Sequence, residues 1–260
     1  MRIDCVMKSD LSNDRSKQTE TGATVSDEHK FIYGALNFEL SAETKRVAKN
    51  KDVIFSGKQY DNLFFNQSGW LCRYKTLRDG ARQIMDFILP GQIFGLQARF
   101  FQRALYSVAT ITDTTLSIVP VGDIEGIFQT NVIFAQALFW SAVCEFAIMS
   151  EHLVSAAQRS AYARVSHLLL ELFVRLKTAN LVDDMSFHMP LTQEHLGSAL
   201  GLTNVHVNRT LKSLRDDKLI AIEGKRVTIL DFDALARLSE FDNSYLAEAA
   251  RGLRRERPRP

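Results

Sequence analysis

Two short helices joined by a glycine constrain the fold of this chain more than any other feature of its sequence. Thr192 is a typical N-cap residue, and Leu196 and Leu200 would share one face of the helix that it begins. Gly201 permits the left-handed backbone of a tight turn, and Thr203 is the N-cap of a second helix. The pattern therefore predicts a helix-turn-helix.

The second helix is predicted to have an apolar inner face and a polar outer face. Its inward positions are Val207, Thr210, Leu211 and Leu214, and its outward positions are Asn204, Asn208, Arg209, Lys212 and Arg215. The outer positions hold three cations and no carboxylate. Arginine and asparagine form paired hydrogen bonds with guanine and adenine in the major groove, so this face is predicted to bind DNA. The small Gly197 in the first helix is expected to let the two helices cross closely.

A β-hairpin is predicted directly after the helix-turn-helix. Residues 219–223 and 226–230 have the composition of two short strands around a turn at Gly224. This arrangement is typical of a winged helix, whose wing lies on phosphate, and Lys225 and Arg226 are candidates for that contact. Helix pairs of this kind also serve protein contacts, so a ligand-binding regulatory module that binds protein is the alternative.

Charge and cysteine content limit the classes of function. The 260 residues carry a net charge of only +2, so the local pattern, and not overall basicity, indicates nucleic acid. The three cysteines, Cys5, Cys72 and Cys144, are far apart, which favours a reducing cytoplasm and predicts neither a disulfide framework nor a metal site. No phosphate loop, metal-spaced cluster or nucleophile elbow is present in the sequence, so no enzyme activity is expected.

Short strands are predicted through most of the N-terminal half. Strand-like runs separated by turn signals lie at residues 53–57, 62–66, 69–76, 82–88 and 107–119. A helical entry is expected over residues 36–49. Many short antiparallel strands without intervening helices indicate a small β-roll or jelly roll. The polar stretch before residue 31 is expected to be a disordered lead.

A short helix at residues 121–129 and a long one at 131–155 follow the predicted roll. The long helix has two apolar stripes, which are Ile133, Ala137, Trp140, Cys144 and Ala147, and Val132, Phe139, Val143, Phe146 and Leu153. One face is expected to cover the roll, and the other to pack against the same helix of a second chain. A membrane span is the rival interpretation, which Glu145, Glu151 and His152 disfavour because they interrupt the apolar run.

The remaining segments complete an α+β organisation. Ser155 to Gln158 is predicted to be a hinge, Ser160 the N-cap of a further helix, residues 180–189 a polar linker, and Asp231 the N-cap of a last helix. The predicted parts are a lead (1–30), a β-roll sensor domain (31–130), a dimerisation helix with its hinge (131–158), a winged helix-turn-helix (159–245) and a basic, disordered tail (246–260).

Three segments carry a resemblance to a known family. They are LTQEHLGSALGLTNVHVNRTLKSLRDDKLI at 191–220, GWLCRYKTLRDGARQI at 69–84 leading to LPGQIFG at 89–95, and SAYARVSHLLLEL at 160–172. With the order of roll, long helix and winged helix, they resemble the Crp/Fnr superfamily of bacterial transcription regulators. The resemblance covers residues 31–241. It implies a homodimer whose paired recognition helices read an inverted repeat in double-stranded DNA, with RNA polymerase as a further partner.

The resemblance places the base-reading positions at Asn204, Val205, Asn208 and Arg209. Arg209 matches the arginine that commonly reads guanine in the family. Val205 departs from the pattern, because many members have a glutamate there that accepts a hydrogen bond from cytosine. Valine accepts none, so the preferred half-site should differ at this position, for instance through contact with a thymine methyl group.

Six residues are predicted to contact phosphate. Thr192, Thr203 and His206 resemble phosphate contacts of the family, and Lys212, Lys225 and Arg226 complete the set. Helix capping explains both threonines equally well, and one residue can serve both roles. An ordinary surface position explains His206 equally well.

The sensor ligand is not determined by the resemblance. Members that bind cyclic nucleotides carry a Gly-Glu pair for the ribose and an Arg-Ser or Arg-Thr pair for the phosphate. This chain has Gly95-Leu96 and Tyr106-Ser107 instead, so neither the carboxylate nor the cation is present. The candidate effector pocket comprises Gly95, Leu96, Arg99, Arg103, Tyr106, Ser107, Met149 and Ser150. No cofactor is expected, and a response to cyclic nucleotides is the alternative.

The other sensors of the family also match this sequence poorly. An iron-sulfur cluster needs four thiolates, and the chain has three cysteines. A haem sensor needs an axial ligand, but His152 and His167 are interpreted as ordinary polar residues on buried helices. The predicted function is therefore a homodimeric, sequence-specific DNA-binding transcription regulator whose sensor ligand is unknown or absent.

Overall fold

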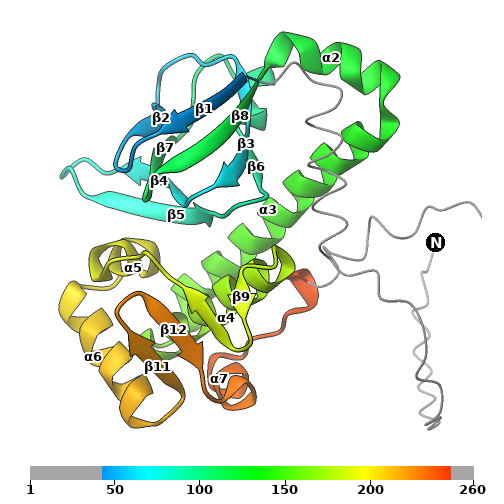
Figure 1. Cartoon of the computed structure of the whole chain (residues 1–260). Coiled ribbons are helices and arrows are strands. Elements are labelled where there is room, and N and C mark those ends of the chain that lie inside the picture. Colours follow the sequence, from blue (N-terminus) through cyan, green and yellow to red (C-terminus); the bar gives the residue numbers. More distant parts are fainter. Residues whose placement is uncertain (1–42, 247–260) are drawn as a thin grey trace, which may run out of the picture.

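The N-terminal half of the protein is an antiparallel β-roll (Figure 1). The computed structural model describes residues 43–246. The strands of the roll are β1 (Glu43–Val47), β2 (Asp52–Ile54), β3 (Asn62–Ser68), β4 (Leu71–Thr76), β5 (Arg82–Ile88), β6 (Ile93–Phe94), β7 (Ser107–Thr110) and β8 (Thr114–Pro120). They form two sheets, in the orders β1-β8-β3-β6 and β2-β7-β4-β5. The predicted jelly roll is confirmed.

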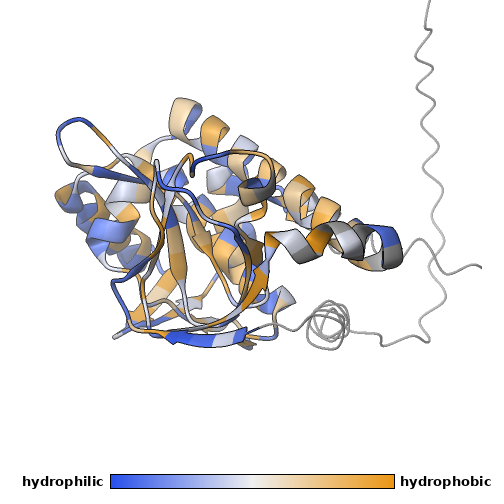
Figure 2. Ribbon diagram, turned by 90° about the horizontal axis from the view of Figure 1, so that it is seen from above, coloured by the Kyte–Doolittle hydropathy of each residue, from blue (hydrophilic) through white to orange (hydrophobic). Residues whose placement is uncertain are grey.

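Strand β1 is a hydrophilic edge strand, and Figure 2 shows it beside the hydrophobic strands of the interior. It pairs antiparallel with β8, from Glu43 opposite Ile118 to Val47 opposite Thr114. The helix expected over residues 36–49 is therefore wrong in its described part. Pairing with a neighbouring strand outweighs the weak helical preference of this short segment. Residues 36–42 lie outside the described part of the chain.

The single strand expected over residues 107–119 is two strands that belong to different sheets. A bend at Thr112 separates them, and side chains hold it in place. The Thr112 hydroxyl accepts a hydrogen bond from the Trp70 amide at 2.9 Å, and the Thr114 hydroxyl donates to the Thr112 carbonyl at 2.9 Å. Threonine side chains that bond to nearby backbone in this way compete with a continuous strand.

Three helices follow the roll, namely α2 (Val121–Thr130), α3 (Val132–Gln158) and α4 (Ala161–Thr178). The predicted hinge at Ser155 to Gln158 is wrong, because α3 remains helical through Gln158. The break falls at Arg159, which is extended, and Ser160 then caps α4 as predicted. The segment contains Ala156 and Ala157, and alanine has the highest helix propensity of all residues.

The C-terminal half is a winged helix-turn-helix. Its elements are β9 (Val182–Asp183), β10 (Ser186–His188), α5 (Gln193–Leu200), α6 (Asn204–Asp216), β11 (Ile220–Glu223), β12 (Arg226–Ile229) and α7 (Phe232–Ser239). The polar linker predicted over residues 180–189 contains β9 and β10, which extend the wing into a sheet of order β11-β12-β10-β9. The prediction was wrong there because Phe187, buried opposite Val227, is the only strongly apolar residue of β10.

The two halves of the molecule pack directly on each other. Helix α5 lies against strand β5 (Figure 1), where the Gln83 side-chain amide donates to the Ala199 carbonyl at 3.4 Å. Trp70, Tyr74 and Phe87 of the roll share one buried apolar cluster with α4 and with the winged helix. The position of the helix-turn-helix is therefore tied to the strands of the roll.

Candidate DNA-binding surface and effector cavity

Side-chain caps fix both helices of the helix-turn-helix. The Thr192 hydroxyl accepts a hydrogen bond from the His195 amide at 3.2 Å, and the Thr192 amide donates to His195 Nδ1 at 3.2 Å. Burial lowers the pKa of His195, which favours the neutral ring that this second bond requires. The Thr203 hydroxyl caps α6 by accepting from the His206 amide at 3.3 Å.

The turn between α5 and α6 depends on two glycines. Gly201 has φ of +65°, which favours a residue without a Cβ. A Cβ at Gly197 would lie 2.6 Å from the Leu202 carbonyl oxygen. Any side chain at Gly197 would therefore push the turn away from α5, in agreement with the predicted close crossing.

Helix α6 divides into the two predicted faces. Its buried residues are Val207, Thr210, Leu211 and Leu214. The residues predicted to read bases, Asn204, Val205, Asn208 and Arg209, are all exposed, as are the predicted phosphate contacts Thr192, Thr203, His206 and Lys212. Positions four residues apart are neighbours on a helix, so Asn204 with Asn208 and Val205 with Arg209 form two adjacent rows of one exposed surface.

The wing presents its cations beside this helix. Lys225 and Arg226 are exposed at the hairpin turn, where Gly224 has φ of +60°. Arg226 forms an ion pair with Asp183 at 3.3 Å, and the two side chains are 55% and 85% exposed. An ion pair this exposed is weak, so Arg226 can exchange its partner for a phosphate at little cost.

A cavity of about 410 Å³ lies between the roll and α3. Of the candidate effector residues, Gly95, Leu96, Tyr106 and Met149 line it. The other described side chains are elsewhere. The Ser107 hydroxyl accepts from the Ser56 amide, the Ser150 hydroxyl donates to the Phe146 carbonyl, and Arg103 lines a separate surface hollow beside Gly57. The side chain of Arg99 lies outside the described part of the structure.

The cavity is also lined by charged residues that the sequence prediction missed, namely Arg73, Glu145 and the exposed Lys75. Arg73 of β4 is 2% exposed and bonds to Glu145 of α3 through Nη1 and Oε1, 2.5 Å apart. Its guanidinium also lies over the Tyr106 ring, 4.7 Å from the centroid. Burial raises the pKa of Glu145 and Arg73 lowers it, with a net upward direction. An arginine inside the apolar strand of residues 71–74 was the sequence signal for this pair.

A second buried group of charges lies where the roll, α3 and α4 meet. It comprises Asp86 of β5, His152 of α3, and Glu171 and Arg175 of α4. His152 was interpreted as an ordinary polar residue, and the structure shows that it is the bridge between these elements. Within residues 43–246, no group of three or more His, Cys, Asp or Glu side chains is arranged to hold a metal ion.

The exposed cationic face, the wing and the adjoining β-roll define a DNA-binding transcription regulator. Residues 163–238 match the Crp-like helix-turn-helix domain, and residues 44–131 match the cyclic nucleotide-binding domain. The chain is 31% identical over 192 residues to the transcriptional activator protein FnrL of Cereibacter sphaeroides, with 72% of this chain and 75% of that protein covered. The protein therefore belongs to the Crp/Fnr family of transcription regulators.

Further relatives agree with this assignment. The nitrogen fixation regulation protein FixK of Azorhizobium caulinodans is 28% identical over 192 residues, covering 74% of this chain and 77% of that protein. The solved structure of FixK2 from Bradyrhizobium japonicum has a TM-score of 0.70 and 25% identity, covering 76% of this chain and 98% of that one. The predicted family, fold class and function as a sequence-specific DNA-binding regulator are confirmed.

Proposed function

We propose that the protein works as a homodimer, and the free face of α3 is the observation that carries this proposal. Four large apolar side chains on it are more than half exposed and recur every seven residues, namely Val132, Phe139, Phe146 and Leu153. A seven-residue apolar repeat is the pattern of helices that pack along each other. An exposed apolar stripe of this kind is typical of an interface, and a two-fold axis lets one stripe serve both chains.

A membrane is the competing partner for this face. Residues Phe134–Gln158 are long and apolar enough to cross a bilayer, and only 17% of the most apolar window is buried. The same helix, however, bonds to the roll through Glu145 and through His152, which pairs with the Met85 carbonyl at 3.0 Å. These polar contacts hold α3 against strands β4 and β5 of the roll, which disfavours insertion into lipid.

Each α6 of the dimer is proposed to read one half of an inverted repeat. Arg209 is assigned to a guanine, Asn204 and Asn208 to hydrogen bonds with bases, and Val205 to an apolar contact such as a thymine methyl group. Thr192, Thr203, His206, Lys212, Lys225 and Arg226 are assigned to phosphate. The two threonines keep their capping role, because a cap uses the hydroxyl oxygen and leaves its proton free for another acceptor.

We propose that DNA binding requires no cyclic nucleotide. At the ribose and phosphate positions the chain has Leu96 and Tyr106, which supply neither a carboxylate nor a cation. The buried cation of the cavity, Arg73, already has Glu145 as its partner. A nucleotide phosphate would have to compete with that carboxylate for the guanidinium, and the other cation that lines the cavity, Lys75, is exposed to solvent, where an ion pair contributes little.

We further propose that the protein acts in the cytoplasm, with RNA polymerase as a partner. The relatives are transcription regulators, and such proteins act on DNA together with the polymerase in the cytoplasm of bacteria. We assign no enzymatic reaction to the chain.

Selection of bound duplexes from a random pool, with purified protein and no added ligand, tests the DNA proposal. We expect an inverted repeat, and the Arg209→Ala variant should lose about 1–3 kcal/mol of affinity for it while binding random DNA unchanged. Arg237→Ala is the matched control, because Arg237 is an exposed arginine of α7, outside the predicted DNA-binding face. A module that binds only protein would show no sequence preference in any variant.

Substitution at the free face of α3 tests the dimer. Phe139→Glu places a charge in the proposed interface without entering the cavity or the core of the roll, since Phe139 is 71% exposed. We expect this variant to sediment as a monomer and to lose its preference for the inverted repeat over a single half-site. A dimer of unchanged stability would overturn the proposed interface.

A further inference from the structure

One arginine of the DNA-binding half is inserted into the roll. Arg175 of α4 is buried, and its guanidinium donates to the Phe87 carbonyl at 2.6 Å, to Asp86 Oδ1 at 3.0 Å and to Gln92 Oε1 at 2.9 Å. These three acceptors all belong to residues 86–92 of the roll. A fourth bond, to Glu171 Oε1 at 2.9 Å, stays within α4. Most of the donors of a guanidinium are therefore used, in one fixed geometry.

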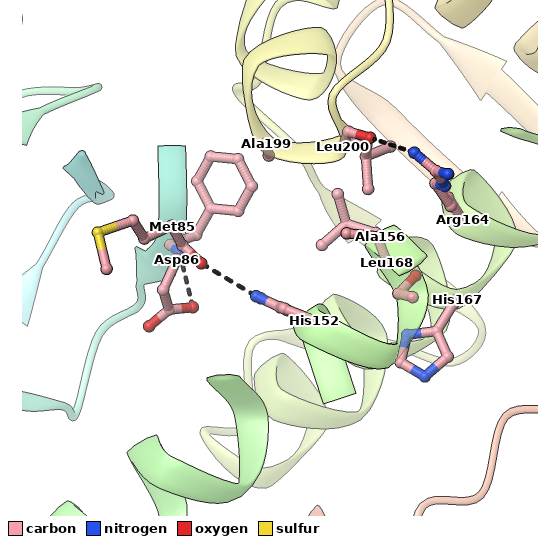
Figure 3. Close-up of a pocket in the computed structure, with 11 residues that line it drawn as sticks. Met85, Asp86, His152, Ala156, Arg164, His167, Leu168, Ala199 and Leu200 are labelled. Atoms are coloured by element: carbon pink, nitrogen blue, oxygen red, sulfur yellow. Dashed lines mark hydrogen bonds between the residues drawn. The ribbon is translucent and has the colours of Figure 1, made fainter. Parts of the chain in front are cut away.

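A histidine joins the long helix to the same place. His152 Nδ1 lies 3.0 Å from the Met85 carbonyl oxygen (Figure 3), and its Nε2 lies 2.9 Å from Glu171 Oε2. A carbonyl and a carboxylate only accept hydrogen bonds, so both ring nitrogens must carry a proton. His152 is therefore an imidazolium in this arrangement.

The four side chains form a closed network without net charge. The cations Arg175 and His152 balance the carboxylates of Asp86 and Glu171, and Glu171 is completely buried. Apolar contacts are not directional, but a buried charge is stable only where its partners stand at bonding distance. The observed placement of α4 relative to β5 and α3 brings each of the four groups to bonding distance of an oppositely charged partner, so the network favours this orientation of the DNA-binding half. We call it the junction clamp.

The clamp is connected to the recognition helix through Arg164. This residue lies on α4, like Arg175, and its Nη1 donates to the Leu200 carbonyl at 3.1 Å (Figure 3). Its Nε donates to the Arg159 carbonyl, at the break after α3, at 2.9 Å. Leu200 is the last residue of α5, directly before the turn into α6. A fixed α4 therefore also fixes where α6 stands relative to α3.

We propose that Arg175, with Asp86, Glu171 and His152, is a positioning residue for DNA recognition that sets the spacing between the two half-sites the dimer accepts. This inference rests on the proposed function, because α3 must be the two-fold axis for the position of α6 to determine a spacing. All four side chains lie outside the recognition helix α6 and outside the wing. They act by holding each α6 at one distance from the axis.

Binding measurements on designed duplexes test the proposal. Wild type, Asp86→Asn and Arg175→Met are compared on a single half-site and on inverted repeats whose spacer is changed by one or two base pairs. We expect unchanged half-site affinity, but a loss of about tenfold in the preference for the best spacer, the scale of a typical coupling between distant sites. The matched controls are Asp233→Asn and Arg237→Met, which change exposed residues of α7, in the same half but outside the clamp and the predicted DNA contacts.

The Arg175→Met variant could lose spacer preference because it folds poorly. The Asp86→Asn variant separates this folding defect from a positioning effect, because it removes a charge but keeps a hydrogen-bond acceptor in place. Unchanged spacer preference in a folded Asp86→Asn protein and in a folded Arg175→Met protein would overturn the inference. If the variants lose half-site affinity as well as the preference for the best spacer, the inference is also overturned, because that result would indicate general damage to the winged helix.

Hydrogen exchange without DNA distinguishes failure of the clamp from failure of the proposed function. The clamp predicts faster exchange in β5 and α5 of both variants, with β3 and β8 unchanged, whatever the oligomeric state. If wild type shows no preference for an inverted repeat, the proposed function fails, and the half-site spacing inference fails with it. Faster exchange would then support only the clamp itself, and unchanged exchange in β5 and α5 would overturn the clamp as well.

Discussion

Two buried groups of charges tie the helices to the roll, and they differ in how completely they are closed. The pair Arg73–Glu145 has one partner that is 33% exposed and faces a cavity of about 410 Å³. In the junction clamp, Glu171 is 0% exposed and Arg175 is 6% exposed. The pair can therefore gain water or a ligand as a substitute partner, whereas Glu171 and Arg175 at the centre of the clamp cannot; of the four clamp side chains, His152 is the one that solvent reaches, being 24% exposed.

The two groups are nevertheless neighbours. Arg73 on β4 pairs in register with Asp86 on β5, so one strand pair carries a member of each group. Met85, whose side chain lines the cavity, also offers its carbonyl oxygen to His152. The contact through Arg73–Glu145 can therefore change its partners, whereas the contact through the junction clamp is fixed.

Replacement of Arg175, the central cation of the clamp, should lower the free energy of unfolding more than any other change. Arg175→Met leaves Asp86 and Glu171 buried without that partner, and loss of one member of a buried ion pair costs about 3–5 kcal/mol. Urea unfolding of the purified protein measures this loss. A change within the range of the exposed Arg237→Met control would show that the clamp contributes little to stability.

The same chemical change in the cavity should cost less. Arg73→Met leaves only Glu145, which water can reach, so we expect a loss of about 1–3 kcal/mol, the cost of an unsatisfied buried polar group. The two arginine variants are compared in one set of unfolding curves. Equal losses would remove the distinction between an open pair and a closed network.

A rise in pH should weaken the junction clamp but leave the Arg73–Glu145 pair unchanged. Burial lowers the pKa of His152, but Glu171 and its hydrogen bond raise it more, to about 9 from an ordinary 6.5. The pKa of about 9 includes smaller upward effects of Asp86 and of the Met85 carbonyl, while neighbouring His167 stays neutral because burial lowers its pKa to about 4. The stabilisation by His152 is therefore complete below pH 6.5 and is lost as the pH rises through 9.

Unfolding free energies measured between pH 6 and pH 10 check this expectation, with His152→Gln as the variant that should lose this pH dependence. The effect should be smaller than that of Arg175→Met, since Glu171 keeps its arginine when His152 loses a proton. A wild-type profile that matches the variant across this range would contradict a charged His152.

Replacement of both Arg73 and Glu145 should change the free energy of unfolding least. In Arg73→Met combined with Glu145→Leu no charge is left unpaired, and apolar replacements of buried ion pairs are often nearly neutral, within about 1 kcal/mol. The doubly substituted protein should therefore be more stable than Arg73→Met alone, as measured by urea unfolding. Additive losses in the double variant would show that the two residues do not interact.

The sequence predicted the helix-turn-helix well because local rules determine it. Helix caps, a turn glycine and a helical repeat of apolar residues all act within a few positions, so Thr192, Gly201 and the two faces of α6 were located correctly. The roles of the exposed side chains in DNA reading stay predictions. The short strands β6, β9 and β10 were missed, because β6 gains its structure by pairing with β3, and β9 and β10 gain theirs by joining the sheet of the wing.

The buried charges were missed because their partners are distant in the chain. Glu171 and Arg175 have the spacing of an ordinary surface pair on a helix, and nothing near them indicates that Asp86, 89 positions away, completes the set. The sequence signal was indirect. Both residues fall within the amphipathic stripe of α4, next to leucines that are fully buried.

The free stripe of α3 has a consequence for how the regulator responds to its own abundance. If a second copy covers Phe139 and its neighbours, the form that binds DNA is made by the association of two identical chains. At low concentrations its amount then rises with the square of the number of chains. A modest rise in synthesis would produce a much steeper rise in promoter occupancy, so the cell gains a threshold without any small-molecule signal.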